Sequence, residues 1–503
     1  MPHISEERFL HPDRYISQDV ASVYKKNHVL VGWPKERKKI FHEIARPFTA
    51  CVVGIALGDE GKGRVIDNFI GTLKKTKGVA GVTAIRFQGG NNSGHTVEVK
   101  GIHLALHQIP SGVMYKKVTC IMDRGMTINP VDLVDEIHYV EDRVGKMKGR
   151  LYLSQDAILN TDLDRAEELL NRIRQGKSGG GTGRGIGPSY AHHYDRLGFH
   201  LSDCMDKNWK TVLGGLYDRY EKEFKLYGVN LSTIEVPDFY KTKKTKKECK
   251  RVVGNKKQFL RRIGRAWQEL MKRKIVTNTF VIHKRIYEKK SEAVIFEGAQ
   301  ALGLHPWFGT LPDITASDTS TFGIQTGTAF WKMQNIENRI GIFKIPYTSS
   351  VGARHMPTHA DDTWAKRVRD EAHEYGTTTG RPRDILFSDL PMLSYNVRMS
   401  GVEMLIGTHL DVSWENVPIP VCTHYTDKRG NVVSYQPGLF YLNKVVPHYV
   451  NLPGWNGVLV RKAHSFSELP ENAKKFLAFF QLRLATPIIA VTTGPSRNHY
   501  FTI

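Results

Sequence analysis

A glycine-rich loop at residues 58–63, Gly-Asp-Glu-Gly-Lys-Gly, combines residue types that bind phosphate with one that can move a proton. It follows an apolar run at 51–57 and precedes an amphipathic stretch, which is typical of a strand, a loop and a helix. Backbone N–H groups at such a helix start can hold an anion, with Lys62 as a point charge. Asp59 would repel phosphate unless a metal or a proton transfer required it, so we expect both phosphate binding and acid–base chemistry. The phosphate-loop consensus has Ser or Thr after the lysine, whereas this chain has Gly63, so the match is poor. The alternative to a phosphate-binding loop is a tight turn with solvated charges.

Two further loops carry polar groups suited to phosphates and nucleobases. Residues 88–96 follow an apolar run at 80–87 and place His95 among amides and hydroxyls. A lone histidine is usually structural, but one flanked by small residues in a polar loop after a buried strand is expected to face a site. Residues 179–190 are so rich in glycine that the backbone can approach a ligand closely, and Thr182 could donate to a phosphate. A flexible linker is the alternative for that segment.

The same arrangement, a polar loop after a short apolar run, recurs along the chain, and it indicates how the elements must be placed. In an open parallel α/β sheet, ligands bind at the carboxyl ends of the strands. The sequence therefore predicts an α/β fold, with a large, mostly parallel central sheet flanked by helices and ligand loops at the strand carboxyl ends. We expect strands at 50–57, 80–87, 294–296, 339–347, 403–407 and 488–491, and helices at 130–148, 163–175 and through most of 206–288.

We expect a single large catalytic domain with insertions at 49–503, preceded by an N-terminal extension at 1–48 of unknown role. A basic insertion at about 240–262 is rich in lysine and arginine. It lacks the aromatic interleaving of a nucleic-acid stacking platform, so a solvated loop and helix face is the preferred interpretation.

Composition limits the classes of function. The chain has 503 residues, 40% of them hydrophobic, and a net charge of +22, which favours an anionic partner such as nucleic acid or a phosphorylated small molecule. No apolar run approaches the ~20 residues of a membrane span, and the polar N-terminus does not resemble a secretory signal. The five cysteines are scattered without metal-ligand spacing, so we expect a reducing, cytoplasmic location and no disulfide framework.

Seven motifs, taken together and in order, resemble the adenylosuccinate synthetase family over roughly residues 50–503. Any one of them alone is weak, but their joint order is specific. They are Gly-Asp-Glu-Gly-Lys-Gly at 58–63, Gly-Gly-Asn-Asn-Ser-Gly-His-Thr at 89–96, Gly-Thr-Gly-Arg-Gly-Ile-Gly-Pro at 181–188, Phe-Glu-Gly-Ala-Gln at 296–300, Thr-Thr-Gly-Arg-Pro-Arg at 378–383, Leu-Asp at 410–411 and Thr-Gly-Pro at 493–495.

The resemblance implies a homodimeric, GTP-dependent ligase that joins IMP and L-aspartate through a 6-phosphoryl-IMP intermediate and uses Mg²⁺. It implies that Asp59 takes the N1 proton of the base and that His95 acts as general acid and stabilises the transferred phosphoryl group. Mg²⁺ would be held by Asp59 and the Gly94 carbonyl. The resemblance implies that GTP is contacted by Glu60, Gly61, Lys62, Gly63, Gly94, Thr96, Arg383, Asp411, Thr493 and Gly494. It implies that IMP is contacted by Asp59, Asn92, Thr182, Gln300, Thr315 and Val351, and by Arg196 across the dimer interface. It implies that aspartate is contacted by Thr378, Thr379 and Arg381.

Departures from the family pattern surround the nucleobases and keep alternatives open. His409 stands where the family has a lysine, the segment 305–312 lacks the usual acidic stretch, and Arg354 replaces a preferred glycine. A viral branch of the family makes 2-aminoadenylosuccinate from dGMP, but its members replace the catalytic aspartate with a small residue, whereas this chain keeps Asp59. GTP or ATP as donor stays open, and nucleic-acid binding on a degenerate synthetase scaffold is the least favoured hypothesis.

Overall fold

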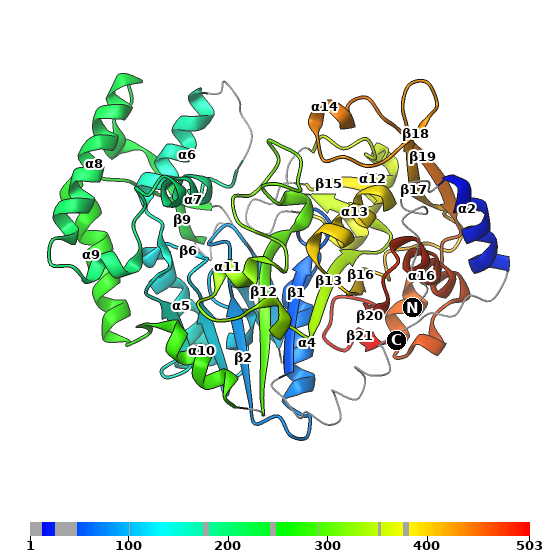
Figure 1. Ribbon diagram of the computed structural model, residues 1–503, viewed down its shortest axis with the longest axis horizontal. Helices are drawn as coiled ribbons and strands as arrows, with labels where there is room; N and C mark the ends of the chain where they lie inside the picture. The colour runs from blue at the N-terminus through cyan, green and yellow to red at the C-terminus, as the bar shows by residue number, and fades with distance from the viewer. Residues whose placement is uncertain are drawn as a thin grey trace.

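One ten-stranded sheet runs through the middle of the protein (Figure 1). The computed structural model describes residues 13–25, 48–99, 101–174, 181–241, 248–289, 291–350, 354–375 and 382–503. Neighbouring strands are parallel, except that the last strand pairs antiparallel at one edge. The order is β11 (Val276–Thr277), β7 (Leu151–Ser154), β5 (Val118–Met122), β2 (Gly81–Arg86), β12 (Glu292–Ala301), β1 (Phe48–Gly54), β13 (Asn338–Lys344), β16 (Met404–Thr408), β20 (Ile488–Thr492) and β21 (Tyr500–Thr502).

The central strands are apolar along their whole length because both faces of the sheet are covered. All seven residues of β1 are buried. Ala50 and Val52 join the core on one face, whereas Cys51 and Val53 join the core on the other, as the alternation of a strand requires. Helix α4 (Lys62–Leu73) packs against β1 and β12. The predicted fold, a large and mostly parallel sheet flanked by helices, is confirmed.

A largely helical lobe lies on one side of the sheet (left in Figure 1). The prediction that 206–288 is mostly helical misses an antiparallel hairpin formed by β9 (Glu235–Lys241) and β10 (Glu248–Val252). The hairpin carries Arg251 into this lobe. The helices are α5 (Pro130–Val144), α6 (Asp162–Arg174), α7 (Ile186–Tyr194), α8 (Trp209–Leu226), α9 (Lys256–Lys272) and α10 (Thr279–Tyr287).

Two arginines of the basic insertion are bound inside this lobe instead of facing solvent. Arg251 forms ion pairs with Asp132 at 3.0 Å and with Asp162 at 2.8 Å, and Arg262 pairs with Asp162 at 2.8 Å. Both carboxylates are buried. Burial would raise the pKa of Asp132, but Arg165, Arg251 and their neighbours hold it well below its usual range. The expectation of a purely solvated basic face is therefore wrong for these arginines.

A second, five-stranded sheet forms the lobe on the other side. The apolar run predicted as one strand at 339–347 is two strands, because Pro346 lacks the N–H that would continue the ladder. This lobe contains β14 (Tyr347–Ser350), β15 (Asp384–Asp389), β17 (Ile419–Thr426), β18 (Val432–Val433), β19 (Val446–Leu452), α12 (Asp362–Ala372), α13 (Leu390–Ser400), α14 (Leu439–Leu442), α15 (Gly457–Lys462) and α16 (Glu471–Leu484).

The described part of the N-terminal extension is helical and packs on this lobe. Helix α2 (Asp13–Val20) and the following π-helical turn η1 (Ala21–Lys25) contact α16. Asp19 of α2 forms a buried ion pair of 2.8 Å with Arg483 of α16. In the described residues, no helix is both long enough and apolar enough to cross a membrane.

Candidate active site

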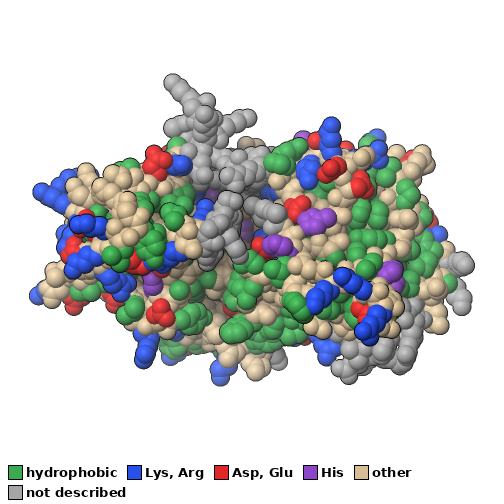
Figure 2. All heavy atoms as spheres, turned by 90° about the horizontal axis from the view of Figure 1, so that it is seen from above, with side chains coloured by type: hydrophobic (Ala, Val, Ile, Leu, Met, Phe, Trp, Pro, Cys, Tyr) green, Lys and Arg blue, Asp and Glu red, His purple; other side chains and the backbone are tan. Residues whose placement is uncertain are grey.

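The polar loops follow the carboxyl ends of the parallel strands, which all lie on the same side of the sheet. Because β12 lies between β1 and β2, the loops at 55–61 and 87–94 emerge on either side of its carboxyl end. Helix α4, which starts at the end of the first loop, packs against β3 (His95–Val99), which starts at the end of the second. Figure 2 looks down on the molecule from above, and purple histidine side chains lie near the middle of this view. The topology therefore brings the two loops to one place.

The loop at 58–63 has the backbone of an anion-binding turn. Gly58, Asp59 and Gly61 all have positive φ, at 98°, 55° and 88°, which for a non-glycine residue such as Asp59 is a strained conformation. The buried Glu60 carboxylate accepts hydrogen bonds from Gly58 N at 2.8 Å and from Lys62 Nζ at 2.7 Å. Glu60 therefore holds the loop and its lysine from within.

Arg383 connects Asp59 to a buried carboxylate in the second lobe. Its guanidinium lies 3.0 Å from Asp59 and 2.5 Å from Glu374. Glu374 also accepts from Lys344 and from Tyr347 Oη, and it is fully buried. Burial would raise the pKa of Glu374, but Lys344, followed by His409 and Arg383, holds it well below its usual range. Arg383 is thus positioned by one fixed anion and in turn positions the Asp59 carboxylate.

His95 is held by a glutamate from the neighbouring strand. Its Nδ1 bonds to Glu297 of β12, and Glu297 also accepts from Ser111 N at 2.8 Å and Ser111 Oγ at 2.7 Å. Both ring and carboxylate are buried. Burial lowers the pKa of His95, whereas the Glu297 carboxylate opposes that shift. Since Nδ1 serves Glu297, Nε2 is the ring nitrogen left for a ligand.

Three of the expected nucleotide contacts have a buried polar atom without a hydrogen-bond partner among the described residues. These atoms are Asn92 Oδ1, Gln300 Nε2 and Thr493 Oγ1. Native proteins rarely leave such atoms unpaired unless a ligand or water binds there. Gln300 also has a positive φ of 53° at the end of β12, a strained backbone of the kind found at binding sites.

The remaining expected IMP contacts differ in exposure. Thr315 is partly buried, and its backbone N–H donates to Leu304 O at 2.7 Å. Thr182 and Arg196 are exposed, and Arg196 has a positive φ of 63°. An exposed arginine on a loop can reach a second subunit, as the expected cross-subunit role requires.

The expected guanine contact, Asp411, follows β16 and is already engaged. Arg461 Nε donates to its carboxylate at 2.8 Å, and the same guanidinium also pairs with Glu371. His409 has a positive φ of 59°, and its Nδ1 bonds to Tyr347 Oη at 2.9 Å. Burial lowers the pKa of His409 to about 4, so it is neutral at pH 7 and does not replace the charge of a lysine.

Several other expected contacts lie at the margins of the described ranges or beyond them. Gly94 is exposed, with open space where a side chain would start, and Gly494 O accepts from Arg64 at 2.5 Å. The side chain of Thr96 is not described, although its backbone pairs with Ala105 in the β3–β4 (Ile102–Leu106) hairpin. Four expected residues lie outside the described ranges: Val351, Thr378, Thr379 and Arg381.

Sequence reasoning missed Glu297, Glu374 and Arg461 as functional candidates. Glu297 lies inside one of the motifs, and a charged residue in an otherwise apolar run was a usable signal. Glu374 and Arg461 had no comparable signal, because their partners are distant in sequence.

The oxygen donors of this site fit Mg²⁺. Among the described residues, no cluster of three or more His, Cys, Asp or Glu could hold a metal by itself. Mg²⁺ commonly takes only one or two protein ligands and completes its shell with water and substrate phosphates. The partly exposed carboxylate of Asp59 and the backbone carbonyl of the exposed residue Gly94 are ligands of that kind.

Comparisons with known proteins identify the family of this chain. The family model for adenylosuccinate synthetase matches residues 51–501. The chain is 34% identical to adenylosuccinate synthetase of Clostridium novyi over 453 residues, covering 89% of this chain and 97% of the relative. It is 30% identical to that of Halothermothrix orenii over 448 residues, covering 89% and 96%.

Solved structures give the same result for the fold. A fully ligated adenylosuccinate synthetase from Plasmodium falciparum superposes with a TM-score of 0.77 at 28% identity, covering 90% of this chain and 99% of that one. The succinoaminodeoxyadenylate synthetase of cyanophage S-2L, bound to dGMP and dATP, shares the fold with a TM-score of 0.53 at 16% identity, covering 90% and 95%. The family match extends over nearly the whole chain, and this protein belongs to the adenylosuccinate synthetase family of carbon–nitrogen ligases.

Proposed function

We propose that this ligase forms adenylosuccinate from IMP and L-aspartate and that GTP hydrolysis drives the reaction through a 6-phosphoryl-IMP intermediate. One observation supports this most directly: Asp59 and Lys62 on the loop after β1, and His95 after β2, flank the carboxyl end of β12. That juxtaposition supplies a base, a phosphate-binding cation and an imidazole at one sheet edge.

In the first step, Asp59 accepts the N1 proton of IMP, and O6 attacks the γ-phosphorus of GTP. The bond to the β-phosphate oxygen breaks as the bond to O6 forms. Lys62 and the backbone N–H groups of the turn stabilise the charge on the transferred group, and His95 Nε2 donates a hydrogen bond or proton to the leaving oxygen. In the second step, the aspartate amine displaces phosphate at C6. The aspartate-binding residues expected at 378–381 are part of this proposal.

Mg²⁺ is the proposed cofactor, held by Asp59 and the Gly94 carbonyl. When bound, it neutralises phosphate charge. The chain's own contribution is to hold Asp59 through Arg383, which pairs with Oδ2 of its carboxylate.

The proposal predicts that purified protein converts IMP, L-aspartate and GTP to adenylosuccinate in the presence of Mg²⁺. Product is measured by chromatography, and GDP and phosphate should appear in equal amounts with it. Replacing GTP by ATP in a parallel reaction tests the donor. If no adenylosuccinate forms at any Mg²⁺ concentration, the proposal is wrong.

dGMP is the second candidate acceptor, giving 2-aminoadenylosuccinate. The departures from the family pattern around the nucleobases motivate it. Among them is Arg354, which stands where the family prefers glycine and donates to Asp313 O at 2.7 Å and to Ser350 Oγ at 2.5 Å. The retained Asp59 argues for IMP. A direct competition of dGMP against IMP decides between them, since one unpaired buried polar group gives large discrimination.

We also propose a homodimer in which Arg196 contacts the IMP of the other subunit, and a cytoplasmic location. The exposure of Arg196 supports the first, and the described cysteines, which form no disulfide, are compatible with a reducing compartment. Light scattering of the purified protein tests the dimer.

A further inference from the structure

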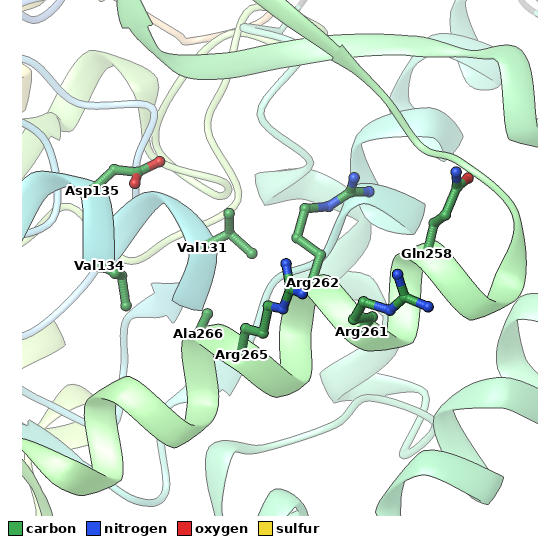
Figure 3. Close-up of a pocket in the computed structure, with 8 residues that line it drawn as sticks. All are labelled: Val131, Val134, Asp135, Gln258, Arg261, Arg262, Arg265 and Ala266. Atoms are coloured by element: carbon green, nitrogen blue, oxygen red, sulfur yellow. The ribbon is translucent and has the colours of Figure 1, made fainter.

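A groove outside the active site lies between residues of helices α5 and α9, which pack against each other (Figure 3). It has a volume of about 420 Å³, within the range of small-molecule sites. The α9 side is strongly basic, whereas the α5 side contributes two valines and one carboxylate. The lining residues are Val131, Val134, Asp135, Gln258, Arg261, Arg262, Arg265 and Ala266.

Of the three arginines that line the groove, one is neutralised by an ion pair with a described residue and two are not. Arg262 is already bound to Asp162 at 2.8 Å and to Val253 O at 2.6 Å. Arg261 and Arg265 are exposed, and neither forms an ion pair with any residue of the described ranges. They lie four positions apart, so their side chains leave the same face of α9. The groove therefore presents two unneutralised guanidinium groups, as recognition of a phosphate requires.

The opposite wall makes a bare phosphate a poor occupant. Asp135 faces the arginines across the groove in Figure 3, and a carboxylate repels an anion that offers no hydrogen-bond donor. Burial, with nearby Asp238 and Asp132, raises the pKa of Asp135 to about 6. Its oxygens can instead accept from a hydroxyl group. Val131 and Val134, which are both partly exposed, add apolar surface on which a flat ring can lie.

We propose that this groove is a second ligand site, separate from the catalytic edge, that binds a sugar phosphate of nucleotide size. Arg261 and Arg265 hold the phosphate, Asp135 accepts a hydrogen bond from a sugar hydroxyl, and the apolar surface covers one face of the base. Helix α9 starts inside the basic insertion, and Gln258, Arg261 and Arg262 of that insertion line the groove, so the site also gives the end of the insertion a role.

Calorimetric titration with CMP tests the proposal, because a pyrimidine nucleotide is a poor fit to a catalytic site that reads purines. The test variant is Arg261→Gln/Arg265→Gln, and the matched control is Lys257→Gln/Lys272→Gln, which removes two exposed charges from the same helix. We expect CMP to bind the wild type and the control equally, and the test variant at least about tenfold more weakly, since that variant loses both charge-assisted contacts to the phosphate. Equal CMP affinity in all three proteins, or no binding to the wild type, overturns the proposal.

Three further measurements separate a sugar-phosphate site from a bare anion site, from a folding defect and from a nucleic-acid surface. Ribose 5-phosphate should bind the wild type more tightly than inorganic phosphate does, and Asp135→Ala should remove most of that difference; an unchanged difference would contradict the role of the carboxylate. Thermal unfolding of the test variant should match the control, because both arginines are exposed. Binding of a single-stranded oligonucleotide that depends on these arginines, without binding of CMP, would assign the groove to nucleic acid and overturn the small-ligand proposal.

Discussion

Replacing Glu297 by glutamine tests whether His95 must be held by an anion. Glu297 accepts three hydrogen bonds, one from His95 and two from Ser111, and all three donors are buried beside it. Glutamine has the same shape but only one accepting oxygen, and its amide group would face a donor. His95 therefore loses a charge-assisted bond and its fixed orientation.

The expected loss can be estimated from that bond. Hydrogen bonds to a charged group contribute roughly 1.5–3 kcal/mol, and each 1.36 kcal/mol is tenfold in rate, so kcat should fall about 10-fold to 150-fold. Nucleotide KM values should change little, because Glu297 bonds to His95 and Ser111, not to the expected substrate contacts. The control is Glu292→Gln on the same strand, a buried carboxylate that bonds to Thr83 at the far end of β12. Its kcat should stay near the wild-type value.

A pH profile separates this role from a merely structural one. Burial already lowers the pKa of His95, and Glu297 opposes that shift, so the pKa falls further once the carboxylate is gone. If protonated His95 is the general acid, activity is lost as pH rises through its pKa, and the alkaline limb of Glu297→Gln should lie at lower pH than in the wild type. A folded Glu297→Gln enzyme with kcat within about twofold of wild type and the same alkaline limb would refute the reasoning.

Four other outcomes follow from the site. Asp59→Ala should abolish adenylosuccinate formation while fluorescence titration still detects GTP binding, whereas Glu415→Gln, at an exposed carboxylate, should keep full activity. Arg196→Ala should raise the KM for IMP about tenfold or more if a second subunit uses it, and an unchanged KM would remove the cross-subunit role. Asp411→Ala should raise the KM for GTP at least about tenfold and leave that for IMP unchanged; equal changes in both would contradict guanine reading. Burial raises the pKa of Asp389 from 3.8 to about 6, so the stability that its neutral carboxyl group contributes is present below about pH 4 and is lost as pH rises through 6. The free energy of unfolding should be measured with denaturant for the wild type and for Asp389→Asn. The wild-type value minus the variant value should fall by up to about 3 kcal/mol between pH 4 and 7.

The parts of the fold encoded in local patterns could be predicted from the sequence. The apolar run before Gly58 predicted a strand buried on both faces at 50–57, because it lacks alternation and ends in a glycine turn. The strand is there, but it covers Phe48–Gly54, and residues 55–57 already belong to the loop. The parallel sheet and the placing of ligand loops at strand carboxyl ends follow from several such runs. The β9–β10 hairpin could not be predicted, because its charged residues resemble a helix surface and two of the three carboxylates that bind Arg251 lie 89 and 119 positions away.

The residues of the candidate site also fall into those that the sequence reveals locally and those that only the fold brings together. Asp59, Lys62 and His95 stand out by their position in glycine-rich loops, whatever the rest of the chain does. The partner of His95 does not, since Glu297 is 202 positions away and only strand order makes them neighbours. Likewise, nothing in the sequence around Asp411 shows that Arg461, 50 positions later, already occupies its carboxylate.

Helix α2 has a practical consequence for how this enzyme can be shortened. The family match starts at residue 51 and the first sheet strand at Phe48, so removing the residues before Phe48 looks harmless. It would, however, strip the Asp19 carboxylate from the guanidinium of Arg483, a cation only 6% exposed, and breaking such a buried pair costs roughly 3–5 kcal/mol. A truncated enzyme should therefore inactivate at a lower temperature than the 503-residue chain. The N-terminal helix α2 thus stabilises α16, a helix more than 450 residues later in the sequence.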